Sequence, residues 1–151
     1  MKFRLYIKYI VYIMIIYIDG IFDLFHRGHL ESFRQVKSLY PDCFLIVGVV
    51  SDKDATGYKR EPIIPEEDRY EIIKSIKYVD NIIKNCPLVV DINFIKENKI
   101  DLIVHGFSNI EDEEKQDIFF KDIKNMGLFR KINYYDKIST SDIIKRIKEF
   151  Y

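Results

Sequence analysis

Residues 11–29 read VYIMIIYIDGIFDLFHRGH, an apolar run that ends in Asp-Gly and passes into a loop with two histidines. β-Branched and aromatic residues dominate residues 11–18, which predicts a buried strand, and the run is shorter than the roughly 20 residues of a membrane span. In residues 28–39, apolar side chains recur at helical spacing until Pro41 stops the pattern. The chain is therefore expected to open as strand, loop and helix.

The same alternation of strand-like runs and amphipathic segments continues to the C-terminus. We predict further strands at residues 44–50, 79–83, 100–105 and 131–135, and helices from Pro65, at 91–98, at 113–126 and from Ser139, with a polar loop before Pro65. This order predicts an α/β fold, a single domain with a Rossmann-like, doubly wound, parallel five-stranded sheet. Ligands of such sheets bind beyond the carboxyl ends of the strands, so the loops after Ile18, Val50, His105 and Tyr135 should form one site.

Composition excludes several classes of protein. A length of 151 residues suits one domain over 1–151, and residues 1–10 form a possible extension because Met14 lies inside the first strand. Twenty-four Lys and Arg balance 24 Asp and Glu, and without a basic excess no nucleic-acid partner is expected. Cys43 and Cys86 are far apart and form no CxxC pair, which favours reduced, buried thiols in a cytoplasmic protein.

Two histidines stand where the first loop enters its helix. His26 and His29 are three residues apart, which places both imidazoles on one side of the first turn. Gly28 allows a phosphate to approach the backbone, and imidazole donors beside a helix N-terminus can stabilise charge on a phosphorus under attack. Two other interpretations stay open: the histidines are helix caps, or they bind a metal with His105, the third histidine of the chain.

A second polar loop enters the last helix with the sequence Ile138-Ser139-Thr140-Ser141. Hydroxyl side chains at a helix start often cap free N–H groups, so simple capping is one interpretation. Opposite the histidine loop, the same hydroxyl and N–H groups favour a second phosphate cradle. Two converging helix N-termini of this kind suit a triphosphate.

The segments DGIFDLFHRGH (19–29) and ISTSDII (138–144) together resemble the cytidylyltransferase family, within it most closely the catalytic domains of choline-phosphate and ethanolamine-phosphate cytidylyltransferases. The resemblance runs over residues 11–147, with landmarks at GVVSD (48–52), Lys59, EDRY (67–70), YVD (78–80) and His105-Gly106. It implies transfer of CMP from CTP to a phosphorylated amino alcohol, phosphocholine first and phosphoethanolamine second. Pyrophosphate would be released without a covalent intermediate.

The resemblance also implies roles for individual residues. His26, His29 and Lys59 would be catalytic, with Lys59 between the phosphates of the two substrates. Contacts to the nucleotide would come from Gly20, Ile21, Phe22, Asp23, Gly28, Asp52, His105, Gly106, Ile138, Ser139, Thr140 and Ser141, and contacts to the second substrate from Asp23, Lys59 and Tyr78. Mg²⁺ would neutralise the nucleotide phosphates, with no metal ligand assigned to the protein.

The same resemblance implies a homodimer that forms through Arg69 and residues 78–80. Taken alone, Arg69 on so charged a helix suggests a surface ion pair, which contributes little to stability. Taken alone, Lys59 suggests a solvated loop side chain. No amphipathic membrane-binding region is expected after the last helix.

One departure from the family pattern lies directly before the Ser-Thr element. The family usually has Arg-Thr-x-Gly there, whereas residues 134–137 of this sequence read Tyr-Tyr-Asp-Lys, so that Tyr134 replaces the arginine. Lys137 or Arg130 would have to supply the missing cation, although neither offers the same planar fork at the same place. An impaired nucleotide-binding relative is therefore one alternative function.

Other departures concern the second substrate. Phe107 and Ser108 stand in place of an acidic pair, and Leu88 in place of the tryptophan of choline enzymes. A quaternary ammonium group prefers an aromatic cage, for which Tyr78, Phe107 and Tyr134 are the candidate rings. A transferase for glycerol 3-phosphate or for another nucleotide therefore stays open as a further alternative.

Overall fold

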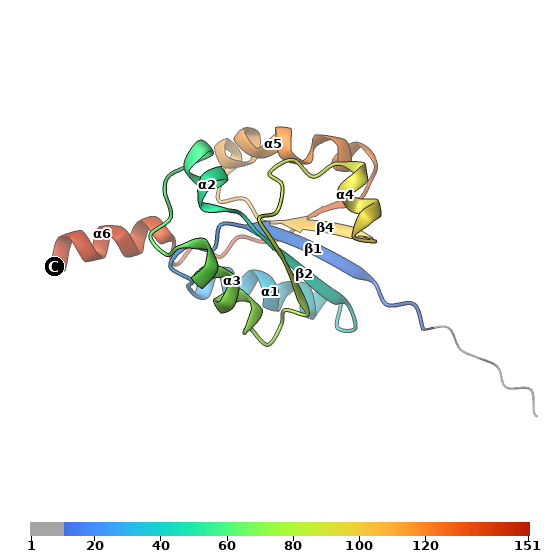
Figure 1. The fold of residues 1–151 in the computed structure, drawn as a ribbon, viewed down its shortest axis with the longest axis horizontal. Helices are drawn as coiled ribbons and strands as arrows, with labels where there is room; N and C mark the ends of the chain where they lie inside the picture. The colour runs from blue at the N-terminus through green and yellow to red at the C-terminus, as the bar shows by residue number, and fades with distance from the viewer. Residues whose placement is uncertain (1–10) are drawn as a thin grey trace, which may run out of the picture.

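Five parallel strands form the centre of the computed structural model, which describes residues 11–151 (Figure 1). The strands follow the order β3-β2-β1-β4-β5, so the chain moves outward from β1 to β3 and then crosses back to β4. This sheet confirms the predicted α/β class and its doubly wound parallel topology. The strands are β1 (Ile15–Gly20), β2 (Phe44–Val49), β3 (Asn81–Lys84), β4 (Leu102–His105) and β5 (Phe129–Lys131).

Helices cover both faces of the sheet (Figure 1). α1 (Arg27–Leu39) and α3 (Glu66–Lys74) pack on one face, and α4 (Ile92–Glu97) and α5 (Ile110–Asn125) on the other. A short α2 (Asp52–Tyr58) follows β2, and α6 (Thr140–Phe150) projects from the body of the molecule towards the C-terminus. Among residues 11–151, no helix is long and apolar enough to cross a membrane.

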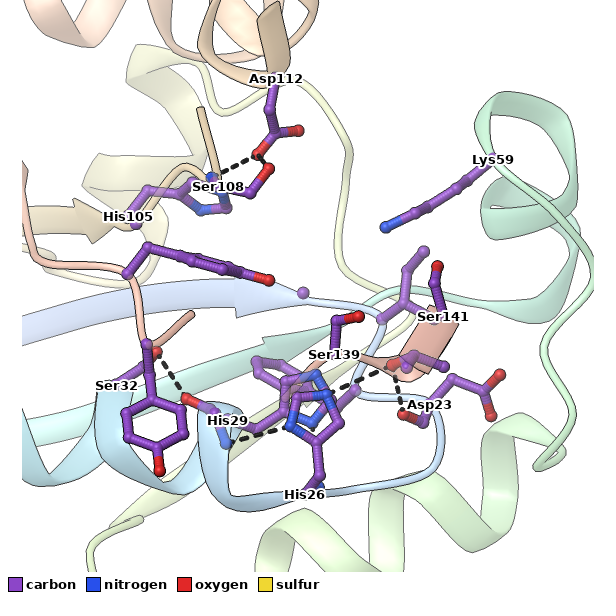
Figure 2. Close-up of a pocket in the computed structure, with 18 of the residues that line it drawn as sticks. Asp23, His26, His29, Ser32, Lys59, His105, Ser108, Asp112, Ser139 and Ser141 are labelled. Carbon is purple, nitrogen blue, oxygen red and sulfur yellow. Dashed lines mark hydrogen bonds between the residues drawn. The ribbon is translucent and has the colours of Figure 1, made fainter. Parts of the chain in front are cut away.

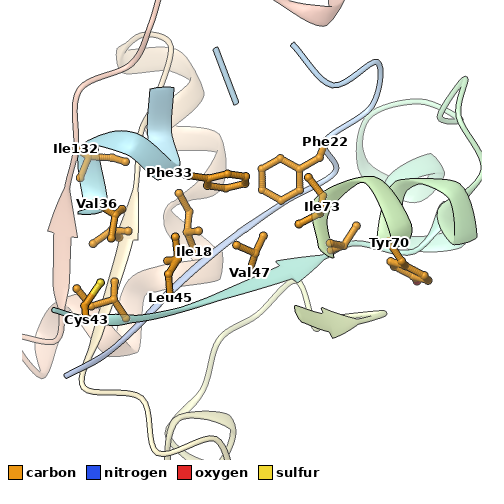
Figure 3. Close-up of a cluster of buried hydrophobic side chains, with 13 residues drawn as sticks. Ile18, Phe22, Phe33, Val36, Cys43, Leu45, Val47, Tyr70, Ile73 and Ile132 are labelled. Atoms are coloured by element: carbon orange, nitrogen blue, oxygen red, sulfur yellow. The ribbon is translucent and has the colours of Figure 1, made fainter. Parts of the chain in front are cut away.

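The central strands are buried on both faces because consecutive side chains point to opposite sides. Ile18 and Val47 face α1 and α3, in one cluster with Phe33 and Ile73 (Figure 3). Tyr17 faces the other way, in a cluster with side chains of α4 and α5. Full burial of such side chains contributes about 1.5–3 kcal/mol each, so these clusters hold the carboxyl ends of β1 and β2 in place.

Both cysteines are free and buried, as the sequence predicted. Cys43 belongs to the cluster beneath α1, and Cys86 to a small cluster with Val50 and Ala55 of α2. Burial raises the pKa of the Cys43 thiol and raises the pKa of the Cys86 thiol much further. Both thiols are therefore protonated at physiological pH and act as small apolar side chains.

Two predictions of local structure are wrong. Residues 52–58 form α2 rather than a loop, because Ser51 Oγ caps the helix by accepting a hydrogen bond from Asp54 N at 3.1 Å and Ala55 is buried. The last strand lies at Phe129–Lys131 instead of residues 131–135, because its pairing with β4 places Phe129 opposite Ile103. The residues after β5 are thereby free to form a loop at the carboxyl end of the sheet.

The first strand begins at Ile15, later than predicted, where it pairs with Phe44 of β2. The Ile15 amide donates a hydrogen bond to Asp101 Oδ2 at 2.8 Å, which ties the start of the strand to the residue before β4. The predicted extension of residues 1–10 lies outside the described residues.

Candidate active site

A pocket of about 470 Å³ opens at the carboxyl ends of the strands (Figure 2). Its walls come from the β1–α1 loop, the turn after α2, the β4–α5 loop and the segment that enters α6. The strand order reverses between β1 and β4, which is where doubly wound sheets form a ligand crevice. The loops that the sequence pattern predicted to meet therefore do meet here.

The two histidines lie together in this pocket and cap α1. His26 Nδ1 accepts a hydrogen bond from Gly28 N at 3.0 Å, and His29 Nδ1 accepts one from His26 N at 3.4 Å. The two rings stack with their centroids 3.8 Å apart. Since each Nδ1 is an acceptor, each neutral imidazole carries its proton on Nε2. The capping interpretation is thus confirmed, and the same two side chains also line the pocket.

Burial keeps the two imidazoles neutral. Burial, together with the positive charges of His26 and Lys59, lowers the pKa of His29 to about 3. Burial also lowers the pKa of His26, although the Asp142 carboxylate opposes that shift. At physiological pH the pair therefore presents neutral N–H donors rather than two positive charges.

Gly28 allows the starts of α1 and α6 to approach each other. A Cβ at Gly28 would lie 2.8 Å from His26 Cε1 and 3.3 Å from the Ile138 carbonyl oxygen, and the first of these distances is not tolerated. Ile138 thus borders the histidine loop through its backbone, although its side chain lies outside the pocket.

Thr140 joins the two helix entrances. Its Oγ1 donates a hydrogen bond to the Asp23 carbonyl oxygen at 3.1 Å and lies 3.4 Å from His26 Nε2. Ser139 caps α6, since its Oγ accepts from Asp142 N at 3.1 Å and donates to Asp142 Oδ2 at 2.7 Å. Simple capping is therefore confirmed for Ser139, and the hydroxyl-bearing residues of this turn also line the pocket.

The buried carboxylate of Asp23 is used by the fold. Its Oδ1 accepts hydrogen bonds from Leu24 N at 3.0 Å and Ile64 N at 2.9 Å, and its Oδ2 accepts one from Ile63 N at 2.9 Å. Asp23 is only 5% exposed. In addition to lining the pocket, Asp23 fastens the segment after Lys59 to the β1–α1 loop, and its predicted contacts to nucleotide and second substrate stay predictions.

Arg69 is buried and forms an ion pair with the partly exposed Asp52 outside the pocket. The Arg69 guanidinium is fully buried and donates hydrogen bonds to the carbonyl oxygens of Ile21, Val50 and Ile64 and to Asp52 Oδ1, the last at 2.7 Å. The expected surface ion pair and the expected role of this guanidinium in a dimer are therefore wrong. Asp52, predicted to contact the nucleotide, does not line the pocket because its carboxylate holds Arg69.

Tyr78 lies at the opposite end of the sheet from the pocket. It precedes β3, so it lies at the amino ends of the strands, where its Oη accepts a hydrogen bond from Arg34 Nε at 3.2 Å. The structure therefore does not bring Tyr78 to the site, against the prediction. Of the three candidate rings, Phe107 is buried against Phe120, and only Tyr134 lines the pocket.

The remaining predicted site residues are gathered as expected. The pocket is lined by Gly20, Ile21, Phe22, Asp23, His26, Gly28, His29, Lys59, His105, Gly106, Ser139, Thr140 and Ser141. His105 Nδ1 lies 3.4 Å from Asp19 Oδ1 without hydrogen-bond geometry and has no other polar partner. In the described part of the chain, no three His, Cys, Asp or Glu side chains are grouped to hold a metal ion.

An acidic side chain that sequence reasoning missed comes from the first turn of α5. Asp112 lines the pocket and accepts hydrogen bonds from Ser108 N at 2.9 Å and Gln116 Nε2 at 2.8 Å. Although burial opposes the shift, these bonds lower the pKa of Asp112. The available signal was the run of acids in a helix that follows His105-Gly106, rather than an acidic pair directly after it. Tyr58 and Arg60, on either side of Lys59, also line the pocket and were not predicted as site residues.

Comparison with known families agrees with this geometry. Residues 17–146 match the model of the cytidylyltransferase-like family, and the chain belongs to that family. Among curated relatives, mouse choline-phosphate cytidylyltransferase A is 38% identical over 136 residues, which is 90% of this chain and 37% of the relative. The probable ethanolamine-phosphate cytidylyltransferase of Encephalitozoon cuniculi is 34% identical over 132 residues, 87% of this chain and 40% of the relative.

The chain thus spans well under half the length of these relatives. Among solved structures, a lipopolysaccharide core biosynthesis protein from Thermoplasma volcanium superposes with a TM-score of 0.64 at 27% identity. That match covers 82% of this chain and 98% of the other, so the two proteins share their fold over nearly the whole of the other chain.

Proposed function

We propose that this chain transfers CMP from CTP to a phosphorylated amino alcohol, phosphocholine first and phosphoethanolamine second, with release of pyrophosphate. One observation carries the proposal: two neutral imidazoles and the hydroxyl-bearing start of α6 face the same pocket, linked through Thr140. The names of the relatives support the nucleotide and the class of acceptor. Phosphocholine stands first because the choline-phosphate relative has the higher identity.

The reaction needs charge stabilisation rather than a protein nucleophile. A phosphate oxygen of the acceptor attacks the α-phosphorus of CTP, and the bond from that phosphorus to the β-bridging oxygen breaks, with its electron pair leaving on pyrophosphate. The Nε2–H groups of His26 and His29 donate to the non-bridging oxygens of the α-phosphate as they gain charge. Donors that are already fixed by caps on Nδ1 need no reorganisation in the transition state.

Lys59 supplies the positive charge beside the histidines. It follows α2 directly, and its side chain extends from there towards the pocket (Figure 2). After burial and His26, its charge contributes to the lowered pKa of His29. In this position Lys59 holds the acceptor phosphate and the α-phosphate together and offsets their repulsion.

Mg²⁺ enters this scheme with the nucleotide, as the Mg–CTP complex that is the substrate. The ion neutralises the β- and γ-phosphates and makes pyrophosphate a better leaving group. The protein contributes hydroxyl and N–H groups at the start of α6 to the same phosphates.

We further propose a cytoplasmic homodimer in which residues 78–80 take part in the subunit contact. Tyr78 is partly exposed at the amino end of the sheet, away from the pocket, so such a contact leaves the site open. Two buried, protonated thiols suit a reducing compartment. Analytical ultracentrifugation of the wild type and of Tyr78→Glu tests the assembly, because a dimer through this segment predicts a monomeric variant.

The experiment that tests the activity is a pyrophosphate-release assay with CTP or ATP, Mg²⁺, and phosphocholine, phosphoethanolamine or glycerol 3-phosphate. We expect release with CTP and an amino-alcohol phosphate. Release only with glycerol 3-phosphate, or only with ATP, would replace the proposed acceptor or nucleotide. No release from any pair, with CTP still raising the melting temperature, would instead support the impaired nucleotide-binding relative.

A further inference from the structure

We propose that Arg60 binds the β- and γ-phosphates of CTP, as the one guanidinium that lines this pocket among residues 11–151. The assignment rests on the proposed function and names a binding residue for it. Arg60 occupies the turn after α2, next to Lys59, and lines the pocket.

The charges that line the pocket make such a residue necessary. Five aspartates line it, and the two stacked histidines are neutral. Against these stand only Lys59 and Arg60 among the lining residues. A triphosphate carries several negative charges, so its binding depends on both cations.

Arg60 and Lys59 lie at different places in the pocket and would therefore contact different phosphates of CTP. Arg60 Nη1 lies 3.5 Å from Ser141 Oγ, in the first turn of α6, whereas the Lys59 side chain extends from the end of α2 into the pocket (Figure 2). The α-phosphate belongs with the histidines in the proposed reaction. The β- and γ-phosphates would therefore extend towards the start of α6, where the Arg60 guanidinium lies.

Most N–H donors of the Arg60 guanidinium have no acceptor among the described residues. Its contact with Ser141 lies at the outer limit of a hydrogen bond, and no carboxylate forms an ion pair with it in the part of the chain that the structure describes. Arg69 shows the contrast, because all of its donors face acceptors of the fold. A planar fork with free donors matches two phosphate oxygens at once.

The other candidates for this role are engaged elsewhere. Arg130 donates to Tyr40 Oη and stacks on that ring, at the end of α1 remote from the pocket. Lys137 does not line the pocket. Arg27 lies over the Tyr135 ring and forms an ion pair with Glu31 at 3.1 Å. Neither of the two substitutes that the sequence suggested for the cation missing at Tyr134 lines the pocket, and we assign its place to Arg60, from a different loop.

The test compares the affinities of CTP and CMP, because only CTP has the phosphates in question. Isothermal titration of the full chain with each nucleotide in Mg²⁺ is carried out on the wild type, Arg60→Ala, Arg60→Lys and the control Arg130→Ala. We expect Arg60→Ala to weaken CTP binding at least tenfold and CMP binding less than twofold, with Arg60→Lys between. Arg130→Ala should bind both like the wild type.

A second variant tests whether a cation elsewhere in the pocket can replace Arg60. Tyr134 faces the same pocket, so Tyr134→Arg in the Arg60→Ala background should restore part of the lost CTP affinity. Equal CTP affinity in the wild type and Arg60→Ala would overturn the assignment, as would an equal loss for CMP. If Arg60→Ala selectively weakens CTP binding but the wild type releases no pyrophosphate, the proposed transferase activity is refuted while the contact between Arg60 and the phosphates is supported.

Discussion

The loop that enters α1 and the loop that enters α6 bound the same pocket, but the fold holds them differently. In the first, Phe22 is 7% exposed and the Asp23 carboxylate accepts three backbone hydrogen bonds. Phe22 and Leu24 adopt left-handed φ values of 57° and 46°, a conformation that costs about 1–2 kcal/mol per residue and that this packing offsets. In the second, Tyr134 is 42% exposed and α6 buries no residue.

This contrast separates two tasks within one site. In the proposed reaction, charge develops at the α-phosphate, so the donors there gain most from being fixed in advance, and the tightly packed loop carries them. The terminal phosphates would bind and then leave as pyrophosphate, which suits a segment held mainly by Ser139, Thr140 and the weak contact from Arg60. The predictions that follow test whether the two loops really differ in this way.

The largest effect is expected for His29→Ala, which removes a fixed donor from the rigid loop. Loss of one such donor lowers kcat by about 10²–10³-fold. Pyrophosphate release under saturating CTP and acceptor measures the change, and far-UV circular dichroism confirms that the variant folds. A rate near that of the wild type would place the chemistry away from the histidine pair.

Asp23→Ala should cost the most stability. It leaves the Leu24, Ile63 and Ile64 amides without their acceptor, and each lost partner costs about 1 kcal/mol or more, so we expect about 3 kcal/mol in urea unfolding. Asp136→Ala is the matched control from the other loop, since Asp136 is exposed, and should change stability by less than about 0.5 kcal/mol. Similar costs for both variants would remove the difference between the loops.

Acid should destabilise the rigid loop through His29. The folded pKa of about 3 lies below the ordinary value of 6.5, so the unfolded chain binds more protons between these values and stability falls as pH falls below 6.5. From pH 6.5 to 5, His29 alone accounts for about 1.5 kcal/mol. Urea unfolding of the wild type and His29→Gln at both pH values isolates this share, and an identical pH dependence would show that the imidazole is not held neutral by burial.

The smallest effect on global stability is expected for Ser139→Ala. The cap of α6 is worth about 1 kcal/mol, but α6 buries no residue, so the loss should appear as local fraying. Hydrogen exchange in the first turn of α6 should quicken while the midpoint of urea unfolding stays nearly constant. A full kilocalorie of global destabilisation would mean that α6 is packed more firmly than its exposure indicates.

Much of the fold and the site followed from local patterns. The apolar run before Asp19 and the helical spacing after Gly28 identified a strand and a helix, because both patterns reflect burial of one element against its neighbours. α2 was missed since it is only seven residues long and owes its formation to the Ser51 cap and to Ala55. β5 was misplaced because its bounds depend on pairing with β4.

For the charged side chains, too, local sequence patterns did not predict roles that depend on tertiary contacts. Arg69 and Lys59 look alike in sequence, as basic residues in a highly charged stretch, yet one is fully buried and the other lines the pocket. The difference arises from three carbonyl groups and Asp52, which converge on Arg69 from three separate segments. No local pattern contains that convergence.

Sequence by itself determined the α/β order, the two helix entrances and the pairing of His26 with His29, because each depends on residues close together in the chain. Only the tertiary structure decided that Asp23 and Arg69 serve the fold, that Tyr78 lies remote from the site, and that Arg60 reaches the start of α6. The physical reason is that a side chain's role is set by which polar groups surround it, and here those groups come from loops that meet only when the parallel strands align their carboxyl ends.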